Sequence, residues 1–273
     1  MRPSPQNKSP VGRVLIIAGS DSSGGAGIQG DIKTVTCLGG YAATAITALT
    51  AQNTEGVFAI HEVHNDFISQ QITLVLSDIG ADAIKTGMLH KASVIDVVVD
   101  AIAGIKIPLV LDPVMFAKGG APLLQADAIA TLKKRLIPLA TIITPNIPEA
   151  EHLADMDIHT VTDMKIAAMR ILTLGCKAVL IKGGHMEGET ISDLLVTAEG
   201  SELFQQKRIH TKHTHGTGCA LASAIATGLA QKMELKAAVE RAQDYVRKAI
   251  EHAPGLGKGH GPLGHGHTVK VSG

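Results

Sequence analysis

Short apolar runs recur along this 273-residue chain, and each run closes in a polar turn. The runs are RVLIIAG (13–19), ATAITALTA (43–51), ADAIKTG (81–87), PLVLDP (108–113), ATIITPN (140–146) and AVLIKGG (178–184). Segments with apolar residues at helical spacing separate them, for example over residues 65–80. Strands that alternate with helices predict a parallel sheet covered by helices on both faces. We therefore expect an α/β fold with a mostly parallel central sheet.

The last third of the chain departs from this alternation. The pattern over residues 191–209 predicts a β-hairpin whose strands are joined by AEGS, and two alanine-rich helices are expected near 217–231 and 235–252. No internal repeat and no linker interrupts the chain. Residues 13–267 are therefore expected to form a single domain.

Charge and hydropathy exclude two classes of partner. Lys plus Arg and Asp plus Glu both number 25, so the chain has no basic excess for nucleic acid, and no apolar run is long enough for a membrane span. The three cysteines, Cys37, Cys176 and Cys219, are odd in number and far apart, which favours the reducing cytoplasm over a disulfide framework. Residues 1–12, rich in proline, are expected to be disordered, and residues 268–273 are expected to be a C-terminal tail.

Polar residues follow the ends of the predicted strands. They are Gly19-Ser20-Asp21, Lys85-Thr86-Gly87, Asp112-Pro113, Thr144-Pro145-Asn146 and Lys182-Gly183-Gly184. In an open α/β sheet, ligands bind outside the carboxyl ends of the strands. Polar loops also occur without any function, but five such ends that bear Asp, Asn, Lys or Gly favour a binding site.

The stretch GSDSSGGAGIQGD (19–31) contains the G-x-G-x-x-G spacing of a dinucleotide site at Gly25, Gly27 and Gly30. In such a site the strand runs directly into the first glycine, whereas here the apolar run ends by Gly19. The second strand ends in the neutral Gln52, where an acid is required, and no Gly-Lys-Ser/Thr follows. Two interpretations stay open: a glycine floor that lets a small, flat ligand approach the backbone, or a tight turn without a ligand.

A second glycine-rich stretch, THGTGCALASAIATGLA (214–230), predicts an anion site. Gly216 and Gly218 flank Thr217, and a helix is expected to begin at about Cys219. Free backbone N–H groups and the helix dipole at such a start bind phosphate or an oxyanion. A thiol at this place is expected to have a lowered pKa and to be reactive; the alternative is a small buried residue that packs well.

The stretch Thr144-Pro145-Asn146-Ile147-Pro148-Glu149 predicts a third polar group. Glu149 is expected in the first turn of a helix, where it either complements the helix dipole or holds Mg²⁺ through water. Asp112 is a second candidate oxygen ligand, and Lys182 is a candidate for neutralising phosphate. A metal, a cation, an anion site and a possible base together favour phosphoryl transfer.

Several long motifs in the same order resemble the hydroxymethylpyrimidine/phosphomethylpyrimidine kinases of thiamine biosynthesis, in the ribokinase-like superfamily. The resemblance extends from Val14 to His267. Its motifs are IAGSDSSGGAGIQGDIKT, ITALTAQNT, KTGML, LDPVMFAKGG, ITPNIPEA, IKGGH and THGTGC. The resemblance implies a ribokinase-like three-layer α/β/α sandwich, a homodimer, and ATP and Mg²⁺ as cofactors.

The resemblance also implies roles for individual residues. Gln52 resembles the residue that pairs with the aminopyrimidine, and Gly19, Ala26, Met88 and Val114 resemble positions that line the ring pocket, with Asp31 as a supporting residue. Asn146 and Glu149 resemble the metal–phosphate motif, with Lys182 and Thr211 as nucleotide-phosphate contacts. Gly216, Thr217 and Gly218 resemble the anion hole, and Cys219 stands where ribokinases have the general base. His213 stands where close relatives are expected to have Asn.

The implied reaction is transfer of a phosphoryl group from ATP to 4-amino-5-hydroxymethyl-2-methylpyrimidine, and then a second transfer to the monophosphate. Three alternatives remain: a pyridoxal or pyridoxine kinase of the same fold, a nucleotide-binding regulator without catalysis, and a redox role for Cys219. The complete set of Cys219, Glu149, Asp112 and Lys182 disfavours the regulator, and the lack of a nearby resolving cysteine disfavours the redox role.

The histidine- and glycine-rich C-terminus contains His260, His265 and His267. Their spacing matches no zinc pattern, and flexible glycines would not preorganise metal ligands. This segment is therefore expected to lie near the nucleotide site or to be exposed.

Overall fold

The computed structural model describes residues 12–117, 120 and 122–269. The disorder expected for residues 1–12 falls almost entirely outside this range, as do residues 270–273 of the tail. The described chain forms a nine-stranded sheet in the order β3-β2-β1-β4-β5-β6-β7-β8-β9. The strands are β1 (Arg13–Asp21), β2 (Tyr41–Gln52), β3 (Val57–Glu62), β4 (Ala83–Thr86), β5 (Leu109–Leu111), β6 (Ile142–Ile143), β7 (Ala178–Ile181), β8 (Thr190–Thr197) and β9 (Gly200–Lys207).

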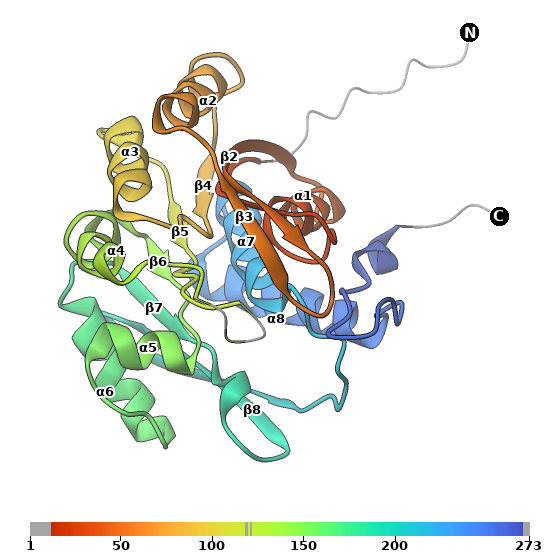
Figure 1. Cartoon of the computed structure of the whole chain (residues 1–273). Helices are drawn as coiled ribbons and strands as arrows, with labels where there is room; N and C mark the ends of the chain where they lie inside the picture. Colours follow the sequence, from red (N-terminus) through yellow and green to blue (C-terminus); the bar gives the residue numbers. More distant parts are fainter. Residues whose placement is uncertain (1–11, 118–119, 121, 270–273) are drawn as a thin grey trace, which may run out of the picture.

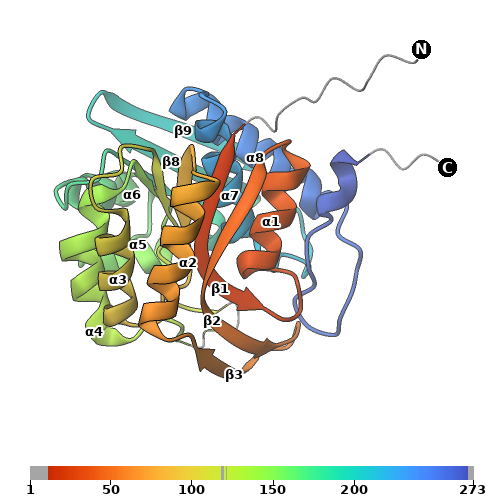
Figure 2. The same cartoon turned by 90° about the horizontal axis from the view of Figure 1, so that it is seen from above.

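Helices cover both faces of the sheet (Figures 1 and 2). They are α1 (Gly27–Cys37), α2 (Asn65–Asp78), α3 (Ala92–Ile102), α4 (Ala126–Thr131), α5 (Ile147–Ala154), α6 (Val161–Leu172), α7 (Thr217–Ala230) and α8 (Leu235–Glu251). Along β1, Val14 and Ile16 join the core with α1, α7 and α8, whereas Leu15 and Ile17 join the core with α2 to α6. Strand side chains alternate between the two faces of a sheet, so an apolar run such as β1 supplies both cores. The three-layer α/β/α sandwich is confirmed.

Six neighbouring strands, β2-β1-β4-β5-β6-β7, run parallel to one another. At the two edges of the sheet, β3 pairs antiparallel with β2, and β8 pairs antiparallel with β7. The parallel pairs are β1 with β2 and β4, and then β4 with β5, β5 with β6 and β6 with β7. The predicted hairpin is present as β8 and β9, which are antiparallel to each other. The carboxyl ends of the parallel strands therefore meet at the same edge of the sheet.

Strand β3 was missed by the sequence analysis. It pairs antiparallel with β2 at the edge of the sheet, and its Phe58 is 72% exposed. Its apolar run, residues 57–60, was not assigned to a strand, because a run of four residues does not by itself distinguish a strand from other structure. Strand β1 also extends two residues beyond Gly19, to Asp21, because its polar end continues the ladder with β2.

Helix α7 packs against the middle of the sheet. Every residue from Ala220 to Ala230 is buried, and a Cβ on Gly228 would lie 2.7 Å from the Cβ of Ala238 in α8. Small side chains let the helix approach its neighbours closely, and this approach places its N-terminus at the carboxyl edge of the sheet (Figure 1).

A buried ion pair joins three of these elements. The Lys85 ammonium in β4 donates to the Asp31 carboxylate of α1 at 2.8 Å, and both side chains are completely buried. The Ser223 hydroxyl of α7 donates to the other oxygen of Asp31 at 2.7 Å. Burial alone would lower the pKa of Lys85, but the Asp31 carboxylate outweighs it and holds the pKa above its usual value. Burial raises the pKa of Asp31, and the Lys85 ammonium opposes that rise, so each charge depends on the other.

We predict that Lys85→Met lowers the free energy of unfolding by about 3–5 kcal/mol, because it leaves the Asp31 carboxylate buried without a counter-charge. Urea denaturation measures the change. The double variant Lys85→Met/Asp31→Leu should recover part of the loss, since it removes both charges. A single-variant loss below about 1 kcal/mol would contradict the assignment of a buried ion pair.

Candidate active site

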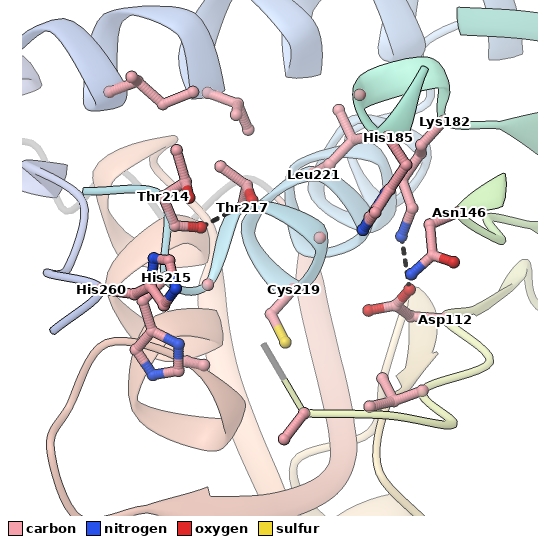
Figure 3. A pocket seen from close by; sticks show the side chains of 18 of the residues that line it. Asp112, Asn146, Lys182, His185, Thr214, His215, Thr217, Cys219, Leu221 and His260 are labelled. Carbon is pink, nitrogen blue, oxygen red and sulfur yellow. Dashed lines mark hydrogen bonds and ion pairs between the residues drawn. The ribbon is translucent and has the colours of Figure 1, made fainter. Parts of the chain in front are cut away.

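A cavity of about 1050 Å³ opens at the carboxyl edge of the sheet (Figure 3). All the predicted site residues line it except Asp31: Gly19, Ala26, Gln52, Met88, Asp112, Val114, Asn146, Glu149, Lys182, Thr211, Gly216, Thr217, Gly218 and Cys219. This volume is at the upper end for a small-molecule site and leaves room for two ligands. Residues from Gly19 to Cys219 that are far apart in the sequence thus line the same cavity.

The two glycine-rich loops touch each other backbone to backbone. Gly216 has φ +87°, and a Cβ there would lie 1.9 Å from the carbonyl oxygen of Gly25. A Cβ on Gly25 would lie 2.4 Å from Cδ2 of His215. No other residue fits at either position. The glycines after β1 therefore permit close contact with the loop before α7, and they do not form a dinucleotide turn.

The start of α7 has the features of an anion site. The helix begins at Thr217, in agreement with the expected bounds of 217–231, and Gly216 caps it without a side-chain acceptor. A Cβ on Gly218 would lie 3.1 Å from Nζ of Lys182, so this cation stands beside the free end of the helix. Backbone N–H groups, a helix dipole and an ammonium group directed at the same space favour a bound phosphate.

The expected lowering of the Cys219 pKa is wrong. Burial raises the pKa of this thiol to about 12; the nearby Lys85 lowers it, but Asp31 and Asp112 oppose that effect. The partial positive charge at the helix start was expected to determine this pKa. Removing the thiolate from water costs more free energy than that partial charge contributes. The sequence could not reveal that two carboxylates surround this position.

Acidic groups line the side of the cavity near β5 and α5. Asp112 accepts from Lys182 Nζ at 3.1 Å, as Figure 3 shows. Asn146 and Glu149 form a reciprocal capping box at the start of α5, with hydrogen bonds of 2.8 and 2.9 Å. Burial raises the pKa of Glu149 to about 7, and Asp112 adds to this rise while Lys182 opposes it. A cation near both carboxylates would relieve this repulsion.

The opposite side of the cavity is mostly neutral and apolar. Met88 packs on Gly19, where its sulfur would lie 3.0 Å from an added Cβ. Val114 packs with Met88 in a small cluster of apolar side chains. Gln52, at the end of β2, adds an amide to this surface. The arrangement suits a flat ring that lacks a net charge.

Asp31 does not line the cavity and cannot contact a ligand there, which corrects its assignment to the substrate-binding group. It is fully buried and binds Lys85 and Ser223. The cavity residues that received no role from the sequence include Lys85, Asp21 and His215. Lys85 and Asp21 could have been found, because both stand at strand ends. The contact of His215 with Asp21 has no local signal.

The C-terminal segment lies against the cavity. His260 lines it, and the backbone N–H of His215 donates to Gly261 O at 3.1 Å. His265 is buried and contacts the Tyr245 hydroxyl at 2.9 Å.

None of the helices in the described ranges is long and apolar enough to cross a bilayer.

Comparison with known proteins adds a family. The family model for phosphomethylpyrimidine kinase matches residues 21–264. The chain is 46% identical over 262 residues to the hydroxymethylpyrimidine/phosphomethylpyrimidine kinase of Haemophilus influenzae, with 94% of this chain and 97% of the relative covered. It is 49% identical over 257 residues to the thiamine biosynthesis bifunctional protein ThiED of Geobacter sulfurreducens. That match covers 94% of this chain and 52% of the relative, so the chain spans about half of that protein.

Two solved structures are similar to the chain. The phosphomethylpyrimidine kinase of Clostridium difficile 630 has a TM-score of 0.78 and 45% identity, with 87% of this chain and 99% of that chain covered. The ADP complex of Bacillus subtilis pyridoxal kinase has a TM-score of 0.87 and 37% identity, with 94% and 98% covered. The expected ribokinase-like fold is confirmed.

We predict that Gly216→Ala destabilises the protein by about 2 kcal/mol or more, because it forces a positive φ on alanine and pushes the two glycine loops apart. Urea denaturation measures the loss. Gly56→Ala is the control, since a Cβ there meets nothing within 4 Å. Equal stability of the two variants would show that the loops do not depend on this contact.

We predict that Cys219 reacts slowly with iodoacetamide at pH 8 and that the rate keeps rising beyond pH 10. The reason is that the thiolate reacts, and the pKa of this thiol is raised to about 12. Mass spectrometry of tryptic peptides measures modification of this residue alone, with a free cysteine peptide as the reference. A rate that levels off below pH 8 would contradict the raised pKa.

Proposed function

This chain belongs to the phosphomethylpyrimidine kinase family, and we propose that it phosphorylates 4-amino-5-hydroxymethyl-2-methylpyrimidine twice with ATP. The first transfer would produce the monophosphate and the second the diphosphate. One observation supports this most: the free start of α7 and Lys182 face the same cavity that Gln52 and Met88 line. A phosphate site and a neutral ring site thus lie together.

The phosphate side of the cavity provides electrostatic stabilisation. In phosphoryl transfer, charge is spread over the equatorial oxygens of the moving group, and fixed donors stabilise it. The backbone N–H groups of 216–218 and the Lys182 ammonium are the donors here. Asn146 and Thr211 extend this surface toward the nucleotide phosphates.

Mg²⁺ fits the acidic side of the cavity. Asp112 and Glu149 are both nearly completely buried, and the raised pKa of Glu149 indicates a site that lacks positive charge. Across the described residues no group of three or more His, Cys, Asp or Glu could hold a metal, so phosphate and water would complete the coordination. Bound there, Mg²⁺ would neutralise charge on the β- and γ-phosphates.

Gln52 would recognise the aminopyrimidine on the acceptor side of the cavity. An aminopyrimidine has an amino donor beside a ring-nitrogen acceptor, and a side-chain amide has one acceptor and two donor hydrogens. Gly19, Ala26, Met88 and Val114 would cover the ring. No counter-charge is needed, because the ring is neutral.

Cys219 is the base that we assign to the first transfer. The hydroxymethyl group must lose its proton as its oxygen attacks phosphorus. The raised pKa keeps the Cys219 thiol protonated in the unliganded site, so Cys219 would take that proton only where the bound nucleotide and Mg²⁺ bring positive charge that favours its thiolate. The acceptor of the second transfer is a phosphate oxygen that is already ionised near neutral pH, since its second pKa is about 6. The second transfer therefore needs no base.

A pyridoxal or pyridoxine kinase is the second candidate. The TM-score of 0.87 with the ADP complex of Bacillus subtilis pyridoxal kinase favours it. The higher identities of 46% and 49%, against 37% for that pyridoxal kinase, favour the pyrimidine. Competition between pyridoxine and the aminopyrimidine in one assay separates the two. A homodimer and a cytoplasmic location are further proposals, which rest on the family resemblance and on the scattered cysteines.

We predict that the wild-type protein consumes ATP with either the alcohol or the monophosphate as acceptor, and that Cys219→Ala separates the two reactions. The variant should lose about 100-fold or more of the first rate, the usual contribution of a positioned base. It should keep most of the second, because the backbone N–H groups of 216–218 remain. Each reaction is assayed separately by ADP release and by mass spectrometry of the product.

Three outcomes would contradict this assignment. Equal losses in both reactions would mean that Cys219 shapes the site without acting as a base. No loss in either reaction would make it a packing residue. Turnover of pyridoxine with neither pyrimidine acceptor used would replace the proposed function with the second candidate.

A further inference from the structure

A buried hydrogen bond links the two glycine-rich loops inside the cavity. His215 Nε2 lies 2.7 Å from Oδ2 of Asp21, and both residues are less than 9% exposed. Asp21 ends β1, and His215 immediately precedes the cap of α7, where Figure 3 shows it beside His260. The phosphoryl-transfer mechanism above uses neither residue.

Asp21 can only accept hydrogen bonds here. Its carboxylate also accepts from the backbone N–H groups of Ser23 and Ala26, both at 2.8 Å. Burial alone would raise the pKa of Asp21, but these donors and His215 outweigh burial and lower the pKa below its usual value. The group is ionised, so His215 Nε2 must carry the hydrogen that it donates.

This hydrogen restricts the amide of Gln52. The amide nitrogen of Gln52 stands 3.4 Å from His215 Nε2, so two N–H groups would face each other. On the other side, Thr50 Oγ1 lies 3.1 Å from the amide oxygen, but its one hydrogen also serves the carbonyl of Ser20 at 2.9 Å. A half-turn of the amide removes both conflicts. The oxygen then lies 3.4 Å from His215 Nε2 and shares, as a weaker second acceptor, the hydrogen that Nε2 donates to Asp21, while the NH₂ donates to Thr50.

We propose that the Asp21–His215 pair is a positioning device that fixes the orientation of the Gln52 amide and thereby the substrate edge that the enzyme accepts. The proposal rests on the proposed function, in which Gln52 reads the aminopyrimidine. With its oxygen toward His215 and its NH₂ toward Thr50, the amide keeps one lone pair and one N–H for the cavity. These match an amino group next to an unprotonated ring nitrogen.

The surroundings of His215 keep its ring in place. Its backbone N–H donates to Gly261 O at 3.1 Å, and the loop pairs with Pro262 as an isolated bridge. The ring packs against Gly25, where even a Cβ would be 2.4 Å away. Because the His215 ring is fixed, its Nε2–H stays directed at Asp21 and favours one orientation of the Gln52 amide. Without this contact the amide could turn, and it could then bind a ligand with either arrangement of donor and acceptor.

The test compares two ligands with opposite edges. 5-Hydroxymethyl-2-methylpyrimidin-4-one, in its N3–H form, presents an acceptor where the aminopyrimidine has its amino donor, and a donor where it has its acceptor. Wild-type protein should prefer the amino compound strongly. In His215→Asn the ratio of the two kcat/KM values should fall by about tenfold or more, because the amide can then turn toward the oxo compound. Calorimetry measures the same ratio from binding.

His213→Asn is the matched control. It makes the same change two residues away, at a ring that is outside the cavity lining, and should leave the amino-to-oxo ratio unchanged. Thr50→Val provides an independent variant if His215→Asn fails to fold, since it removes the partner on the other side of the amide. It should also lower the ratio. Circular dichroism verifies the fold of each variant.

The outcomes separate the two proposals. Equal losses with both ligands in His215→Asn, with an unchanged ratio, would overturn the positioning role and leave the pair a support for the loops. Wild-type binding of the amino compound without turnover would overturn the proposed function, while a lowered binding ratio in the variant would still support the positioning role. A wild type that binds neither compound would overturn both.

Discussion

Contact between the backbones of Gly25 and Gly216 is the constraint on which the site depends. The space between these loops is smaller than one methyl group, since a Cβ on Gly216 would lie 1.9 Å from the carbonyl oxygen of Gly25. The contact joins the end of β1 to the start of α7. It therefore places the N-terminus of α7 beside the first loop, and it brings His215 within 2.7 Å of Asp21.

Charge in this cavity is arranged in buried pairs. Lys85 is neutralised by Asp31 beneath the site, and Lys182 is paired with Asp112 at its edge. Glu149 and Cys219 remain without full compensation, and the pKa of each is raised. Lys182 lies beside the start of α7 with Asp112 as its partner, so additional negative charge near these carboxylates is tolerated poorly without a further cation. This balance is consistent with a nucleotide that arrives together with Mg²⁺.

In the proposed function, the two sides of the cavity have different tasks: one side binds phosphate and the other side selects the acceptor. The phosphate side, with the start of α7, Lys182 and the α5 capping box, would serve any acceptor alcohol. The similarity to both pyrimidine and pyridoxal kinases agrees with a shared machinery of this kind. Acceptor choice then depends on few side chains, among which Gln52 and its neighbours are the polar ones. One fold can thus support several substrates through small changes in one wall.

Local patterns in the sequence were enough to predict the alternating strands and helices, the polar strand ends and the helix that follows the glycines at 216–218. Each of these features depends on residues that are close in sequence. Periodicity indicates which faces are buried, and glycines before a helix indicate free N–H groups. Family resemblance added the role of Gln52, whose place in the cavity agrees with it. Edge strand β3 stayed hidden because its apolar run, residues 57–60, is too short to identify a strand.

Only the tertiary structure decided what long-range packing controls. Asp31 looked like part of the substrate site, yet it faces Lys85 in the interior, 54 positions away along the chain. Cys219 looked activated by a helix start, yet burial and two carboxylates raise its pKa. Asp21 and His215 are 194 positions apart and meet only because two glycine loops touch. A sequence specifies its local backbone through short-range sterics and burial periodicity, whereas the field at a buried atom is a sum over neighbours that only the folded chain brings together.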